Sequence, residues 1–213
     1  MKGCLFFVVG MVIFSCSRLD VHEKFPFQPI FLKPFLSDAS MSEKDLQKKL
    51  GNMKDKVVAL LPFYSQKNLP LDATSDLQNS TALFLPKLKP APKNFSTTLP
   101  FRAWEKEEWN SLQTYQQYLY ETGISERLLS QKIAQKTGSD VFFTFQIVDW
   151  PDKELPTNSL VFYLRLVDGN TGLILWRGIL KKVTEEKEPK ALKKIAEGMI
   201  HTLLEVCWEE MHS

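Results

Sequence analysis

Residues 140–182 read DVFFTFQIVDWPDKELPTNSLVFYLRLVDGNTGLILWRGILKK, and this stretch decides the fold. Apolar and polar side chains alternate over 140–150 and again over 160–168, as expected for strands with one buried face. A third apolar run covers 173–182, and residues 168–172 join it to the second as a turn, because Asp and Asn bond turn backbone and glycine accepts positive φ. The stretch therefore predicts three strands that end in a β-hairpin. The residues on one face are Val141, Phe143, Phe145 and Ile147, then Leu160, Phe162, Leu164 and Leu166.

Helices are predicted on both sides of these strands. Residues 105–121 and 125–137 carry apolar side chains three or four positions apart, and Gly138 ends the second segment as a C-cap. Residues 189–211 form a third such segment, with Pro189 in its first turn. The side chains expected to face inward are Trp109, Leu112, Tyr115 and Leu119; Leu128, Leu129, Ile133 and Ala134; and Leu192, Ile195, Ala196, Met199, Leu203 and Val206.

The part of the chain before these helices is less regular. Residues 56–63 (KVVALLPF) predict a buried strand, and 42–55 a polar helix. Residues 64–103 contain five prolines and show no periodicity, so we expect a Pro-rich insertion without regular structure. The fold class predicted is α+β: a mixed sheet of four or five strands with a C-terminal β-hairpin, covered by helices. Residues 42–213 would form this single domain.

The N-terminus has the features of an export signal. Lys2 is followed by an apolar run over 5–14, too short for the roughly 20 residues of a spanning helix. Cys16 follows the small residue Ser15, with aliphatic Ile13 three positions before it, and this pattern resembles a bacterial lipobox. That resemblance implies cleavage after residue 15 and diacylglycerol on Cys16, with each buried CH₂ contributing ~0.8 kcal/mol to membrane attachment. A plain signal peptide with an incidental cysteine, or an uncleaved anchor, are the alternatives.

Residues 16–41 would then connect the lipid to the domain as a Phe- and Pro-rich tether. The chain has 27 Lys and Arg against 25 Asp and Glu, and this near-neutral balance argues against nucleic acid as a partner. Cys4 leaves with the signal peptide and Cys16 would be acylated, so Cys207 is unpaired and we expect it to be buried.

Residues with catalytic or metal-binding spacing are absent from the sequence. The three histidines have no ligand partners at zinc spacing, and neither a nucleophile elbow nor a phosphate- or dinucleotide-binding loop occurs. Asp149 and Asp152 are paired carboxylates, but beside Pro151 they favour a turn over acid–base chemistry. We therefore predict no catalytic residue, no metal, no cofactor and no enzymatic activity.

A basic stretch is the candidate contact surface. Between residues 86 and 104 there are basic residues and no acids, and aromatic residues alternate with the charges. Such a surface suits anionic lipid, glycan phosphate or an acidic protein; the alternative is a solvated loop whose aromatic residues pack on the core. The candidate contact residues are Lys87, Lys89, Lys93, Phe95 and Arg102.

Three motifs carry a family resemblance. They are VALLPF at Val58–Phe63, Gly-Ser-Asp at Gly138–Asp140, and the D-x-x-T-G-x-x-L-W pattern over 168–176. Together they resemble a superfamily of bacterial envelope lipoproteins that includes the curli-secretion lipoprotein, the activator of penicillin-binding proteins and the N-terminal domain of the Tol translocation protein. Within it, Ile-Ser-Glu-Arg at Ile124–Arg127 resembles a poorly characterised lipoprotein family. The matched motifs are structural, and the Pro-rich insertion at 64–103 departs from the family pattern.

The resemblance implies a lipid-anchored, non-enzymatic envelope lipoprotein that binds or regulates an envelope-assembly partner. Its partners would be the membrane, through its acyl chains, and an unidentified envelope protein or cell-wall component. Ser17, in place of an inner-membrane retention aspartate, favours the periplasmic face of the outer membrane. An oligomeric secretion or pore component and a cell-wall hydrolase are the alternative functions.

Overall fold

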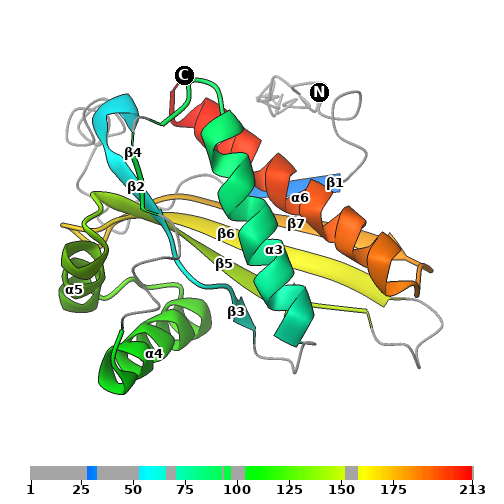
Figure 1. Ribbon diagram of the computed structural model, residues 1–213, viewed down its shortest axis with the longest axis horizontal. Coiled ribbons are helices and arrows are strands. Elements are labelled where there is room, and N and C mark those ends of the chain that lie inside the picture. Colours follow the sequence, from blue (N-terminus) through cyan, green and yellow to red (C-terminus); the bar gives the residue numbers. More distant parts are fainter. Residues whose placement is uncertain are drawn as a thin grey trace, which may run out of the picture.

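The computed structural model places most of the predicted domain around one twisted sheet (Figure 1). Within the described residues this sheet has seven strands, in the order β1-β7-β6-β5-β2-β4, with β3 paired to β5. The structure describes residues 28–32, 53–65, 71–92, 94–96, 104–151 and 158–212.

Three long antiparallel strands form the centre of the sheet. They are β5 (Val141–Asp149), β6 (Asn158–Asp168) and β7 (Ile174–Thr184). β6 pairs with both β5 and β7, so the predicted strands and the C-terminal hairpin are confirmed. The apolar residues at alternate positions of β5 and β6 all lie in the larger hydrophobic core, as their spacing predicts.

Short strands extend the sheet on both sides. β2 (Val57–Leu60) is parallel to β5, and β4 (Asn94–Ser96) is parallel to β2. β3 (Tyr64–Ser65) continues alongside β5, and β1 (Gln28–Leu32), within the predicted tether, pairs antiparallel with β7. The sheet is therefore mixed and the α+β class is confirmed.

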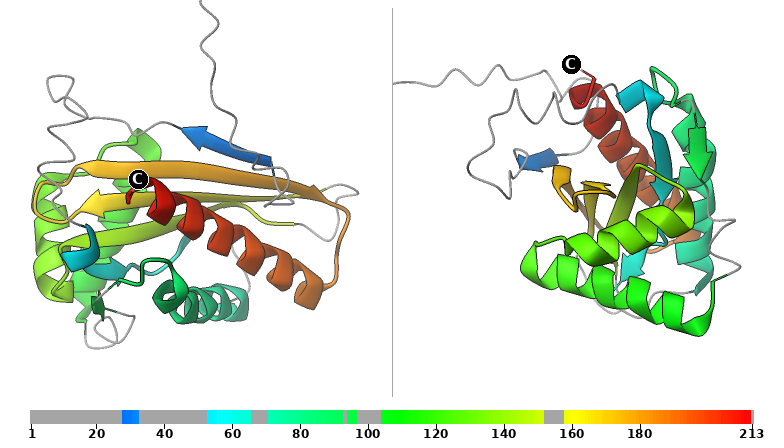
Figure 2. Two further views of the ribbon diagram at one scale, coloured as in Figure 1. Left: turned by 90° about the horizontal axis from the view of Figure 1, so that it is seen from above. Right: turned by 90° about the vertical axis from the view of Figure 1, so that its left-hand side faces the viewer.

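Helices cover both faces of the sheet. α3 (Leu71–Phe84) and α6 (Pro189–Glu210) lie side by side over one face (Figures 1 and 2). α4 (Lys106–Thr122) and α5 (Arg127–Thr137) pack against the other face near β2 and β5, where they enclose a smaller core. The buried residues of this smaller core are Ala59, Leu61, Leu112, Tyr115, Leu119, Ile133, Phe142, Val167 and Ile174.

The Gly-Ser-Asp motif joins β2 to β5. Gly138 has a φ of +64° and ends α5 in the left-handed conformation predicted for it. Asp140 then pairs with Val57 in both directions: the Val57 amide donates to the Asp140 carboxylate at 2.8 Å, and the Asp140 amide donates to the Val57 carbonyl at 2.9 Å. The motif therefore aligns the first residues of the two strands.

Helix α3 corrects the prediction of an irregular insertion over 64–103. The prolines of that stretch lie at 70, 86, 90, 92 and 100, so residues 71–85 are free of them. In this window Leu77, Thr81 and Leu85 are buried and spaced four apart, which is helical periodicity. The stretch therefore contains a helix between its prolines. Of the predicted helix over 42–55, residues 42–52 lie outside the described residues, and Met53–Asp55 form a 3₁₀ turn (η1).

Leu128 corrects the predicted inward face of α5. Ile133 and Ala134 are buried as predicted, and Leu129 is half-buried against the smaller core, but the Leu128 side chain is 66% exposed. At ~100° per residue, Leu128 lies ~140° around the helix from Ile133 and so points away from the sheet. Ser130 and Thr137, which are polar, occupy the buried face in its place.

Candidate functional site

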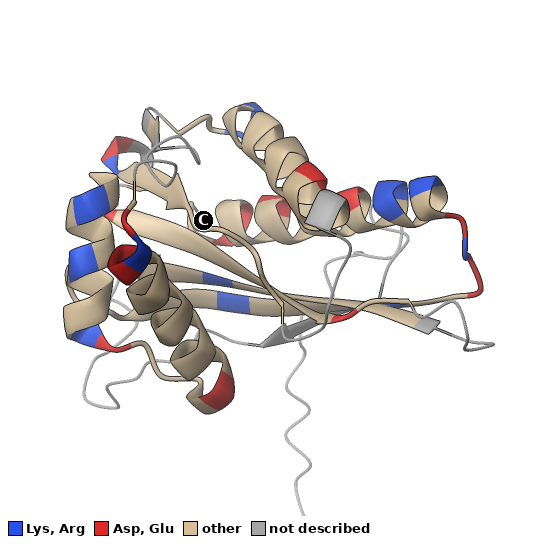
Figure 3. Ribbon diagram, turned by 60° about the horizontal axis from the view of Figure 1, so that its bottom comes forward, with Lys and Arg blue, Asp and Glu red and all other residues tan. Residues whose placement is uncertain are grey.

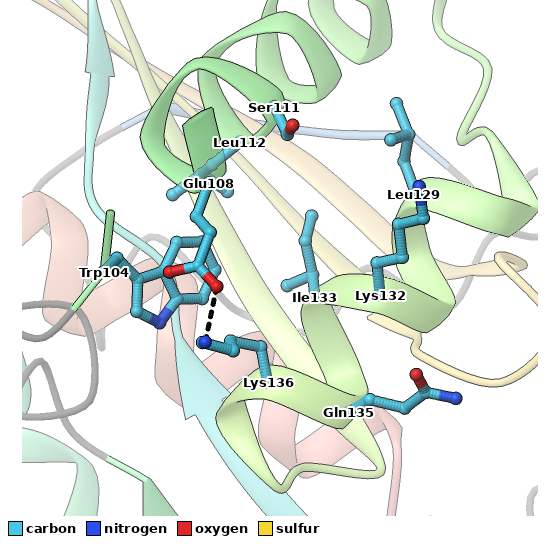
Figure 4. Close-up of a pocket in the computed structure, with 9 residues that line it drawn as sticks. All are labelled: Trp104, Glu108, Ser111, Leu112, Leu129, Lys132, Ile133, Gln135 and Lys136. Carbon is cyan, nitrogen blue, oxygen red and sulfur yellow. Dashed lines mark ion pairs between the residues drawn. The ribbon is translucent and has the colours of Figure 1, made fainter. Parts of the chain in front are cut away.

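A pocket opens between α4 and α5 (Figure 4). Its volume is about 380 Å³, near the lower limit for sites that bind a ligand or an anchoring side chain. Leu112 and Ile133 are buried in its floor, and Trp104 and Leu129 are half-buried beside them. The rim is polar and consists of Glu108, Ser111, Lys132, Gln135 and Lys136.

The first turn of α4 is fixed by a capping box. The Glu105 side chain accepts from the backbone of Glu108, while the Glu105 amide donates to the Glu108 carboxylate at 2.8 Å. Glu108 also forms an ion pair with Lys136 of α5 across the pocket, drawn as the dashed line in Figure 4. The hydrogen bond from Lys136, followed by that from the Glu105 amide, lowers the pKa of Glu108. This pair therefore joins the start of α4 to the end of α5.

The second half of α4 lies over polar side chains of the sheet. Tyr120 and Thr144 share a hydrogen bond of 2.7 Å between their hydroxyl oxygens, and Gln116 donates to the Pro62 carbonyl at 2.7 Å. Arg165 of β6 lies beneath, between the rings of Tyr120 and Tyr163, at 4.5 Å and 3.8 Å from their centroids. Hydrogen bonds and ring contacts thus set the orientation of α4 on this part of the sheet.

The turn between β6 and β7 holds α5. Gln131 of α5 donates to the Asn170 carbonyl at 2.7 Å. Gly172 packs so closely against the start of α5 that a Cβ built on it would lie 2.9 Å from the Arg127 Cα. Glu126 caps the helix by accepting from the amides of Leu128 and Leu129 at 3.2 Å and 3.1 Å.

The same turn explains the D-x-x-T-G motif. The Asp168 carboxylate accepts from the amides of Asn170 and Thr171 and from the Thr171 hydroxyl, at 2.8–3.0 Å. The Gly172 amide then donates to the Asp168 carbonyl at 2.8 Å, with Gly172 at a φ of +73°. The motif therefore builds the support for one wall of the pocket.

Charge is unevenly divided between the two helices. α5 carries Arg127, Lys132 and Lys136 and no acidic residue, so blue recurs along it in Figure 3. α4 begins with acidic residues, one of which neutralises Lys136. In the part of the chain that the structure describes, Lys132 has no ion-pair partner, and it lies exposed on the pocket rim.

The exposed apolar side chain of Leu128 extends the site beyond the pocket. Leu128 is 66% exposed on α5, one helical turn before Lys132. Large apolar side chains in contact with water beside an apolar pocket are typical of a binding surface. We call the pocket together with Leu128 the α4–α5 groove.

The groove combines an apolar floor with a polar rim. Glu108 is the one carboxylate among its lining residues, and it is held by Lys136. Over the described residues, no group of three or more His, Cys, Asp or Glu side chains could hold a metal ion. No helix among them is both long and apolar enough to cross a membrane.

The predicted contact residues lie elsewhere. Lys87 and Lys89 are exposed after the end of α3, near a 3₁₀ turn (η2, Leu85–Lys87). Phe95 in β4 is half-buried and packs on the larger core. Trp208 of α6 donates to the Pro90 carbonyl at 2.7 Å, which ties this segment to α6. Cys16, Lys93 and Arg102 lie outside the described residues.

Cys207 is fully buried, as predicted, and burial raises the pKa of its thiol well above the ordinary value. Asp149 accepts from the Trp150 amide at 3.1 Å and from the Ser159 hydroxyl, at the end of β5. Asp152 lies outside the described residues.

The comparisons with known proteins are distant. The sequence matches no protein-family model and no curated protein. Among solved structures it is similar to a PelC dodecamer from Paraburkholderia phytofirmans, with 10% identity and a TM-score of 0.46 over 74% of this chain and 90% of that one. It is also similar to lipoprotein GNA1162 from Neisseria meningitidis, with 14% identity and a TM-score of 0.38 over 70% and 97% of the two chains.

A further similarity is to the LpoB C-terminal domain from Salmonella enterica, with 16% identity and a TM-score of 0.34 over 66% of this chain and 93% of that one. These TM-scores all lie below 0.5, so the similarities indicate nothing about function.

Proposed function

We propose that this chain is a lipid-anchored, non-enzymatic lipoprotein of the bacterial envelope that binds an envelope protein through the α4–α5 groove. The observation that carries the proposal is the open apolar pocket between two helices, with the exposed side chain of Leu128 one helical turn before the rim residue Lys132. Burying this surface against a partner would remove apolar area from water, at about 25 cal/mol per Å².

The N-terminal sequence supports the envelope location. Residues 1–16 combine a basic start, a short apolar run and a cysteine after a small residue, which together favour export and acylation of Cys16. Ser17 favours the periplasmic face of the outer membrane. The groove would then face partners within reach of a tether that starts at the membrane surface.

The anchor is tested by metabolic labelling with an alkyne analogue of palmitate in a bacterial host with intact lipoprotein processing. We expect the full chain to be labelled and to sediment with membranes, and the Cys16→Ala variant to lose both properties. A soluble, unlabelled product of the unaltered chain would contradict the anchor while leaving the groove untested.

The groove is tested by crosslinking in intact cells. In one strain a photoreactive amino acid replaces Gln135, which is exposed on the pocket rim. In a second strain it replaces Lys194, which is exposed on α6 over the opposite face of the sheet. We expect one protein to be captured from position 135 and not from position 194. Equal capture from both positions, or capture of lipid alone, would contradict the proposal.

A blocking variant gives the matched control. Ser111 is exposed at the pocket, and Gln113 is exposed on the same helix outside it. Ser111→Trp should fill the pocket and abolish capture from position 135, whereas Gln113→Trp should not. Capture of a second copy of this chain, accompanied by a ring in electron microscopy, would instead favour the oligomeric assembly.

A further inference from the structure

We infer that the α4–α5 groove recognises an acidic amphipathic segment of its partner, with apolar anchors three or four residues apart and a carboxylate beside them. This inference rests on the proposed function, because it specifies the chemistry of the surface that the partner presents. Two features of the groove carry it: the arrangement of its apolar side chains and the sign of the charge along one wall.

The apolar side chains form more than one contact position. Leu112 and Ile133 lie in the pocket floor, whereas Leu128 stands outside it on the exposed side of α5. A partner that fills the pocket and also covers Leu128 needs at least two apolar side chains on one face. A helix presents such side chains at positions three or four apart, which is how amphipathic helices occupy grooves between helices.

The charge along α5 selects the polar part of the partner. Lys132 lies between Leu128 and Lys136 on the helix surface, at i+4 from the first and i−4 from the second. Lys136 is engaged by Glu108, so Lys132 is the rim cation left to receive an incoming carboxylate. A carboxylate next to an anchoring side chain would reach Lys132 as the anchor enters the pocket, and a basic residue there would be repelled.

A single acyl chain fits these observations less well. An acyl chain with its carboxylate on Lys132 would occupy the pocket of about 380 Å³ but would leave the exposed Leu128 uncovered. A protein segment can cover the pocket and Leu128 together. The occupant to which we commit is therefore a segment of a partner protein.

The probe is a library of random 16-residue peptides displayed on phage and selected against the full lipidated chain in nanodiscs. We expect the enriched peptides to share two large apolar residues three or four apart with Asp or Glu adjacent to one of them. Elution by a long-chain fatty acid serves as a parallel arm. Enrichment of basic or uncharged apolar peptides would overturn the inference. It would also be overturned if no peptide family were enriched and the fatty acid alone bound the groove.

A charge reversal makes the test specific. Lys132→Glu should weaken the selected peptides by at least roughly fivefold and, in a new selection, should enrich Lys or Arg where Asp or Glu stood before. Lys194→Glu is the matched control, since it makes the same reversal on the exposed side of α6, and it should change neither result. Unchanged binding to Lys132→Glu would overturn the inference.

Failure of the inference and failure of the proposed function are distinguishable. Enriched peptides that bind Gln113→Trp but not Ser111→Trp require an open pocket. If such peptides show no preference for acidic residues, the proposed function stands and the inference is refuted. Enriched peptides that bind Ser111→Trp normally would place the contact outside the groove and refute both.

Discussion

Gly172 in the β6–β7 turn lies directly against Arg127, the first residue of α5. A Cβ on Gly172 would come within 2.9 Å of the Arg127 Cα and 3.3 Å of its backbone nitrogen, and Gly172 has a φ of +73°. Both the left-handed backbone and the close approach require glycine. Through this contact the β6–β7 turn, which is a recognisable sequence motif, supports α5 and therefore one wall of the groove.

Gly172→Ala should therefore destabilise the protein in two ways. The left-handed conformation costs about 1–2 kcal/mol for alanine, and displacing the α5 backbone adds a further cost. We expect a loss of about 3 kcal/mol in the free energy of unfolding, measured by urea denaturation with circular dichroism.

Gly138→Ala is the matched control for that prediction. Gly138 has a similar φ of +64°, but a Cβ there would meet nothing within 4 Å. This variant should lose only about 1 kcal/mol, the cost of the backbone conformation. Equal losses in the two variants would mean that the contact between Gly172 and Arg127 contributes nothing to stability.

Leu128 and Ile133 should differ sharply in their contribution to stability. Leu128 is 66% exposed and Ile133 is 5% exposed. We expect Leu128→Ser to change the free energy of unfolding by less than about 0.5 kcal/mol, and Ile133→Ser to lower it by about 3 kcal/mol. Crosslinking from position 135 should nevertheless be lost in Leu128→Ser. A large loss of stability in that variant would show that Leu128 packs inward.

The central strands and the hairpin could be predicted because alternation and turn chemistry are local. The apolar side chains of β5 and β6 repeat every second residue, and the Asp168–Gly172 turn contains its own hydrogen bonds. Helix α6 was predictable for the same reason, since its apolar residues repeat at helical spacing and Pro189 starts it.

The groove could not be predicted, because it depends on tertiary packing. The sequence prediction grouped Leu128 with Leu129 as inward, but the rotation of α5 on the sheet, where Gln131 contacts the β6–β7 turn, leaves Leu128 exposed. The pocket exists because Trp104 and Lys136 come together from opposite ends of the α4–α5 hairpin. The basic stretch over 86–104 predicted Lys87 and Lys89 as contact residues, because a sequence shows where charge lies but not where the folded surface is concave.

Arg165 should contribute little through its charge. It is 2% exposed, its Nη1 has no hydrogen-bond partner among the described residues, and burial lowers its pKa. Its contacts are with the rings of Tyr120 and Tyr163. Because a buried charge without a carboxylate is costly, Arg165→Met should leave the free energy of unfolding unchanged or raise it by about 1 kcal/mol.

Arg165→Lys separates the charge from the packing. Lysine keeps the charge but loses the planar contact with the two tyrosine rings, and its ammonium is more strongly hydrated. We expect this variant to be less stable than Arg165→Met by about 2 kcal/mol in urea denaturation. The opposite order would mean that the charge itself makes a favourable contact at this position.

His201 should make the domain sensitive to mild acid. Its ring stacks on Phe84 with centroids 3.8 Å apart, and burial, followed by the charge of Lys87, lowers its pKa from 6.5 to about 4. The unfolded chain therefore binds this proton more readily than the folded one. The stabilising effect of the neutral ring is complete above pH 6.5 and is lost as the pH falls from 6.5 toward 4.

His201→Phe keeps the stacking without the titration, so its free energy of unfolding should fall less than that of the unaltered chain between pH 7 and pH 5. Chemical denaturation at half-unit pH steps measures the difference, and parallel pH profiles would show that His201 titrates normally in the folded protein.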